Sequence, residues 1–209
     1  MIFTVDGQRV NESFTPEDTL QTSIDRVRAN YPSERLIVSV SINGQRLNDA
    51  DLAARLAQPL GAGAQVDLET GCARTLVTDA LRGLALEFDQ AGGQLADIAN
   101  RLSAGQGAAA VRDVGAFVSL WQTCYRALAQ CSGLLGDDLT TYLYEGRTVK
   151  EWLADLILKL DELRGALEAH DTVLLADLLR YEMQPLTQTW QSVTASLAEQ
   201  VAGGSDGTT

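Results

Sequence analysis

The sequence predicts an α+β protein with a mixed N-terminal domain at residues 1–71 and an antiparallel four-helix bundle at residues 72–202. Short β-prone segments joined by strong turn dipeptides lie before Gly71, whereas apolar residues after it recur at alternating steps of three and four. With 45% apolar and 21% charged residues, the chain has a globular composition rather than a disordered one. Residues 203–209 are expected to form a flexible tail.

The first half of the N-terminal domain is predicted to be a hairpin followed by a helix. Ile2–Val5 is apolar and β-prone, and Asp6-Gly7 favours a type I′ turn, which needs positive φ at both central positions. The return strand is expected at about residues 9–14. Thr15 is expected to cap a helix that has Pro16 at its first position. The apolar face of this helix comprises Leu20, Ile24 and Val27.

The second half of this domain is predicted to contain a second hairpin, a short helix and a last strand. Residues 36–42 form the best strand of the chain because they are β-branched and partly alternating. Asn43-Gly44 is the second turn signal, and Asn48 is expected to cap a short helix. The last strand is expected at residues 64–68, where apolar and polar residues alternate.

This order of elements resembles the ubiquitin-like β-grasp fold. Ile42–Leu47 lies where that family places the short hairpin between its third and fourth strands. The resemblance implies a recognition module, since β-grasp domains carry many functions. Protein modifiers of the family end in an exposed Gly-Gly that is conjugated, but here the chain continues from Gly71 into a helix. Gly203-Gly204 follows a different domain, so we do not expect conjugation.

Four segments after Gly71 carry an apolar seam with a period of 3.5 residues, which predicts four amphipathic helices packed at shallow angles. Short joints between the first and second helices, and between the third and fourth, favour antiparallel pairs. Gly92 and Gly93 are expected to break the first helix, and Pro185 to bend the fourth. The seams cover residues 77–102, 114–135, 149–167 and 176–197.

Composition and motifs argue against several classes of function. The net charge of −12 disfavours unaided binding to nucleic acid or to an anionic membrane. Three cysteines without a C-x-x-C pair form neither a disulfide scaffold nor a zinc knuckle, and His170 is the single histidine. No nucleotide-binding or hydrolase motif occurs. We therefore expect no enzyme activity, no cofactor, no metal site and no membrane insertion, and we expect a cytoplasmic location.

A surplus of apolar residues outside the seams points to a protein partner. The last helix and the connection at residues 132–147 both carry such residues. The sequence leaves a second interpretation open, in which the helix is central and the connection is a lid packed over the end of the bundle. The residues expected to bind a partner are Leu139, Tyr142, Tyr144, Leu174, Leu178 and Tyr181.

The run Asp171–Leu186 resembles the final helices of small helical accessory proteins of bacterial flagella and protein export. This resemblance implies an export chaperone as one form of a non-enzymatic adaptor. Two alternatives stay open. Polar side chains converging inside the bundle would instead indicate an enzyme or a ligand carrier with a site in the core. Heptad seams also build intermolecular bundles, so a homo-oligomer is the other alternative.

Overall fold

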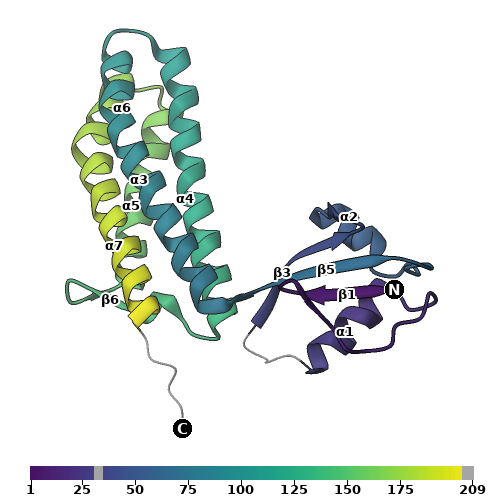
Figure 1. Ribbon diagram of the computed structural model, residues 1–209. Helices are drawn as coiled ribbons and strands as arrows, with labels where there is room; N and C mark the ends of the chain where they lie inside the picture. The colour runs from purple at the N-terminus through teal and green to yellow at the C-terminus, as the bar shows by residue number, and fades with distance from the viewer. Residues whose placement is uncertain (31–34, 204–209) are drawn as a thin grey trace. The chain divides into compact units, whose positions relative to one another are not determined.

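The computed structural model describes residues 1–30 and 35–203, with only the backbone at residues 107 and 108. The described chain is α+β, as predicted, and it divides into two compact units, Met1–Ala73 and Arg74–Thr209 (Figure 1). The division falls slightly later than Gly71 because the last strand of the sheet continues to Cys72. Of the predicted tail, Gly203 ends the last helix, and the residues after it lie outside the described part of the chain.

The N-terminal unit is built on a five-stranded sheet with the strand order β2-β1-β5-β3-β4. The central strands β1 and β5 run parallel, and the other neighbours are antiparallel. Both predicted turns are confirmed, with positive φ values of 49° at Asp6 and 52° at Asn43. The strands are β1 (Ile2–Val5), β2 (Gln8–Arg9), β3 (Arg35–Ile42), β4 (Gln45–Arg46) and β5 (Gln65–Cys72).

Two helices belong to this unit, α1 (Leu20–Asn30) and α2 (Asp49–Arg55). The predicted cap of α2 is confirmed, since the Asn48 side chain accepts from the backbone amide of Asp51 at 2.9 Å. Apolar side chains from alternate strand positions and from one face of α1 form a single core. Its most deeply buried members are Phe3, Val5, Leu20, Val66 and Leu68.

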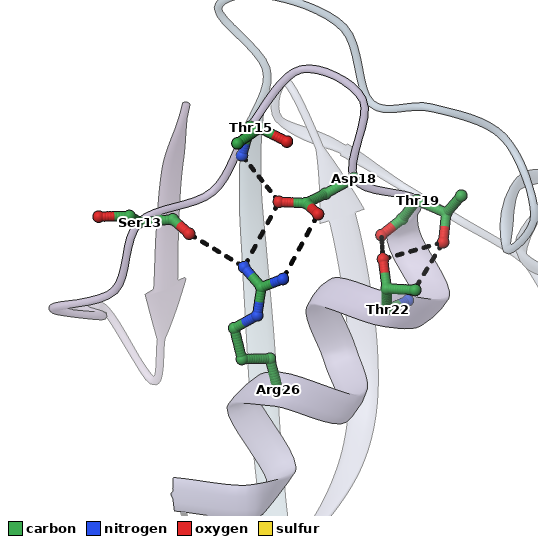
Figure 2. Close-up of polar contacts among 6 residues, drawn as sticks. All are labelled: Ser13, Thr15, Asp18, Thr19, Thr22 and Arg26. Atoms are coloured by element: carbon green, nitrogen blue, oxygen red, sulfur yellow. Dashed lines mark hydrogen bonds and ion pairs between the residues drawn. The ribbon is translucent and has the colours of Figure 1, made fainter.

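The predicted start of α1 at Thr15 is wrong, because residues 15–18 form a turn instead. The Thr15 amide donates to the Asp18 carboxylate at 2.7 Å, and the Asp18 amide donates back to the Thr15 carbonyl. Thr19 then takes the capping role by accepting from the Thr22 amide at 3.2 Å. Figure 2 shows how Arg26 ties this turn to α1, by donating to the Ser13 carbonyl and pairing with Asp18.

Asp6 links the first hairpin to strands β3 and β5 of the sheet. Its carboxylate accepts from the Thr70 hydroxyl at 2.6 Å, from the Thr70 amide at 2.8 Å and from Arg35 at 3.0 Å. The hydroxyl and the amide of Thr70, followed by the charge of Arg35, lower the pKa of Asp6 below its ordinary value. The folded chain therefore holds this carboxylate in its ionised form.

Because the pKa of Asp6 is lower in the folded state, its stabilisation is present above the unfolded pKa and is lost as the pH falls through the folded pKa. We expect the sheet of wild-type protein to be more stable than that of Asp6→Asn at neutral pH. The difference should shrink as the pH falls from the ordinary range of an aspartate pKa through the lower pKa of the folded state. Urea titrations followed by the NMR amide signals of β5 measure it, and a difference that stays constant with pH contradicts the assignment.

The second unit contains four long helical segments and a compact connection (Figure 1). The predicted seams lie in one continuous core, which includes Trp121 and Trp190. The connection holds a short 3-10 helix and a two-stranded ribbon. The helices of the second unit are α3 (Ala73–Ser103), α4 (Gly107–Leu135), η1 (Leu139–Thr141), α5 (Val149–Glu168), α6 (Thr172–Asp177), the π-helix η2 (Leu178–Met183) and α7 (Gln184–Gly203). The strands of its ribbon are β6 (Leu143–Tyr144) and β7 (Arg147–Thr148).

The interruptions of the helices differ from the prediction. α3 continues through Gly92 and Gly93 without a break, and a Cβ built on Gly92 would meet the Thr187 methyl of α7 at 3.7 Å. The last helix is instead divided just before Pro185, which has no amide to donate to the Tyr181 carbonyl. The backbone widens into the π-helix η2, and the Gln184 amide donates to the Leu179 carbonyl, five residues back.

Candidate functional site

The connection between α4 and α5 packs onto the bundle instead of presenting a free surface. Leu139 is fully buried, so its assignment as a partner-binding residue is wrong. Tyr142 is half-buried, and its hydroxyl donates to Asp137 at 2.7 Å. The carbonyl of Tyr144 accepts from the Trp152 indole at 3.3 Å. The ribbon and the 3-10 helix thus cover the end of the core, as the alternative interpretation of this segment expected.

The three predicted residues of the last helical segment do not form one surface. Leu178 is 9% exposed and belongs to the core, whereas Tyr181 is 64% exposed and Leu174 is also exposed. The assignment of Leu178 as a binding residue is therefore wrong. Their spacing would place the three on one face of a regular α-helix. The π-helix that begins at Leu178 changes the phase of the residues after it, so the face is not continuous.

A different apolar surface lies on α5, at positions outside the seam. Ile157 and Leu158 are 57% and 62% exposed, although they follow the buried Leu156 directly. Each faces a different hollow, because Ile157 lines one between α4 and α5 and Leu158 lines one beside η2 and α7. The apolar run of residues 156–158 is the sequence signal for this surface, because two of its three residues fall outside the seam that predicts the core side of the helix.

The hollow between α4 and α5, here called the α4–α5 groove, has a volume of about 520 Å³ and is almost entirely apolar. Its most exposed apolar residue on α4 is Tyr125, at 63%. Arg126 and Gln122 are the polar groups among its described lining residues, and the Arg126 guanidinium donates to the Gln122 carbonyl at 3.4 Å. The apolar lining consists of Val118, Trp121, Tyr125, Leu153, Leu156, Ile157 and Leu160.

The second hollow, beside η2, is smaller and has a paired polar rim. Its volume is about 360 Å³, and Leu158 and Tyr181 are its exposed apolar residues. Lys159 pairs with Glu182 at 3.1 Å and with Glu162 at 3.2 Å. The hydrogen bonds from Glu182 and Glu162 raise the pKa of Lys159 above its ordinary value. Tyr181 of η2 is thus a predicted site residue that lines this hollow together with Leu158 of α5.

The described lining of these two hollows contains neither a cysteine nor His170. Burial raises the pKa of the Cys124 thiol to about 12, so it stays protonated. His170 lies exposed in the tight turn between α5 and α6, with a φ of 53°. Within residues 1–30 and 35–203, no three potential metal ligands gather at one place. In that same part of the chain, no helix combines the length and the apolar character that crossing a membrane requires.

The helical unit also carries the similarity of this chain to known sequences. A family model described as Domain of unknown function (DUF8042) matches residues 88–193, just over half of the chain. The chain belongs to this family. The DUF8042 segment begins within α3 and ends within α7, so it contains both walls of the α4–α5 groove. No curated protein and no solved structure matches the chain.

Proposed function

We propose that this DUF8042 protein is a non-enzymatic adaptor that binds an amphipathic helix of a partner protein in its α4–α5 groove. The exposed apolar wall formed by Tyr125 and Ile157 carries this proposal. A groove between two long helices suits a third helix, whose apolar residues recur at steps of three and four. Burying a large apolar side chain contributes about 1.5–3 kcal/mol, so covering both residues offsets part of the cost of association.

The positive charge of Arg126 at the groove indicates which charged side chain the partner helix carries beside its apolar face. Arg126 bonds a backbone carbonyl and has no carboxylate partner among the described residues. A carboxylate at the edge of the partner's apolar face would pair with it. The partner is therefore an amphipathic helix with an acidic residue beside its apolar stripe. An export chaperone, which the resemblance of Asp171–Leu186 implies, is the specific form of adaptor that this proposal favours.

Two buried threonines inside the bundle offer no free hydroxyl to a ligand, which favours an adaptor over a core-site enzyme or ligand carrier. Thr187 and Thr194 are fully buried, but their hydroxyls donate to the carbonyls of Met183 and Trp190 at 2.7 and 2.8 Å. Both groups are therefore satisfied within their own helix and do not converge on a ligand site.

We also propose a fold assignment for each of the two units. The N-terminal unit is a β-grasp domain, which the strand order β2-β1-β5-β3-β4 with parallel central strands supports. The helical unit is a four-helix bundle in which α6, η2 and α7 together make one interrupted helix. The shared core of the four seams supports this second statement.

Replacing Ile157 with aspartate should remove partner binding without unfolding the protein. A charge in the groove opposes burial by an apolar helix face, whereas the free protein already exposes this position to water. We expect the partner recovered from source cells to fall by about tenfold or more. Leu86→Asp is the matched control, because Leu86 is 64% exposed on α3, outside the groove. It should leave the recovery unchanged.

A photo-crosslinking residue placed at Tyr125 locates the contact. Crosslinks to a helix of the recovered protein support the proposal. Equal recovery by Ile157→Asp and Leu86→Asp contradicts it. Crosslinks to a second copy of this chain would replace the adaptor with a homo-oligomer. In each case a thermal melt of the variants near the wild-type midpoint shows that the fold is intact.

A further inference from the structure

The strand β3 has an open edge in its first half. On one side it pairs with β5 along its length, from Arg35 to Ile42. On the other side β4 pairs only with Ser41 and Ile42, and the last bond is from the Leu47 amide to the Val40 carbonyl at 2.9 Å. Among the described residues, no strand pairs with residues 35–39 on that side. An unpaired edge of this kind is a template for another strand.

A hollow of about 580 Å³ lies along this open edge. Four consecutive residues, 37–40, line it, although successive side chains of a strand point to opposite faces. Consecutive residues line a hollow when the hollow borders the edge of the strand, where every residue presents its main-chain groups. Ile24 of α1, Leu52 of α2 and Leu56 just after α2 contribute apolar side chains to its walls, beside polar ones such as Gln21 and Asn48.

The edge is irregular at Val38, where the pairing with β5 shifts register between Ile37 and Ser39. Val38 is 41% exposed, so an apolar β-branched side chain faces solvent at the middle of the open segment. Five residues at about 3.3 Å each provide about 16 Å of edge, which accommodates a short added strand. Apolar residues at alternate positions of that strand would contact Val38 and the apolar walls.

The described charged residues that line the hollow are mainly positive, whereas the whole protein has a negative net charge. Arg28 and Arg46 both line it, and neither has an ion pair or a hydrogen bond among the described residues. Asp49 is the acidic residue among the described lining. Two unpaired arginines beside an apolar strand edge, in a chain with a net charge of −12, favour an acidic ligand.

We infer that the β3 edge binds an extended acidic peptide of a partner protein as an added strand, with alternate apolar residues against Val38 and the walls and with carboxylates on Arg28 and Arg46. This site lies in the N-terminal unit and is independent of the α4–α5 groove. A second copy of this chain is a poorer occupant, because pairing two β3 edges brings arginines of both copies to the same interface.

Selection from a displayed library of random peptides, with full-length protein as bait, tests this inference. We expect the selected peptides to alternate apolar residues and to carry aspartate or glutamate. Charge reversal in the double variant Arg28→Glu, Arg46→Glu should weaken their binding by about tenfold or more. Arg82→Glu, Arg112→Glu is the matched control, because both arginines are exposed on the helical unit, and it should bind as wild type does.

Two further measurements separate strand addition from other modes of binding. Methylating alternate backbone amides of a selected peptide removes its strand hydrogen bonds but keeps its side chains, so it should abolish binding. The NMR amide signals of residues 36–40 should shift on addition of the unmodified peptide. The inference is overturned if no peptide is selected, if the methylated peptide binds equally well, or if the double variant binds unchanged. Pairing of β3 edges between two copies, seen as a dimer mass that excess peptide does not dissociate, also overturns it.

Discussion

Replacing Trp190 with alanine is expected to lower the free energy of unfolding of the helical unit by about 3–5 kcal/mol. Trp190 is completely buried, and its ring lies 5.8 Å from that of Trp121 and 6.3 Å from that of Phe88, measured between centroids. These three rings come from α7, α4 and α3, so Trp190 joins three helices. Alanine would leave a cavity that rigid neighbours on all three cannot close.

Urea unfolding followed by far-ultraviolet circular dichroism measures this loss, because the helical unit dominates the signal. Trp190→Phe is the matched control, since it keeps an aromatic ring. It also removes an indole N–H that is buried without an acceptor in the described part of the chain. We expect its loss to be well below that of alanine. Equal losses for the two variants would contradict a role for the ring in packing.

Replacing Leu178 with aspartate is expected to cost about 3–5 kcal/mol and to melt the helical unit cooperatively. Leu178 is 9% exposed and belongs to the core, so the substitution removes apolar contacts and places a carboxylate in apolar surroundings. It also falls at the first residue of the π-helix η2, where the backbone is already irregular.

Tyr181→Asp provides the comparison for Leu178→Asp, because Tyr181 lies three residues further along η2 and is 64% exposed. We expect its thermal midpoint to stay close to that of the wild type, while Leu178→Asp shows a collapse. A near-native midpoint for Leu178→Asp would instead mean that this side chain is on the surface, and it would restore Leu178 to a binding role.

The parts of the fold that could be predicted are those that short stretches of sequence determine. Asp6-Gly7 and Asn43-Gly44 specify their turns because few residues tolerate positive φ. Asn48 and Asp171 cap their helices through bonds to amides three residues ahead. The seams predict core residues such as Trp190, because a period of 3.5 places them on one side of each helix.

Local signals failed where several of them compete. Both Thr15 and Thr19 have the chemistry of a helix cap, and the Asp18 carboxylate decides between them by binding the Thr15 amide and Arg26. Gly92 resembles a helix breaker, yet it lies buried in α3, where a Cβ would be at ordinary contact distance from the Thr187 methyl of α7. In this case tertiary packing overrides the local preference of glycine.

The sequence by itself determined which residues are apolar and with what period, and hence the α+β class and the core side of each helix. Only the tertiary structure decided which apolar residues outside the seams are covered. Leu139 is buried although polar residues flank it, whereas Ile157 and Leu158 are exposed although they lie in an apolar run. Exposure depends on where neighbouring helices pass, and the order of strands that opens the β3 edge depends on contacts between distant residues.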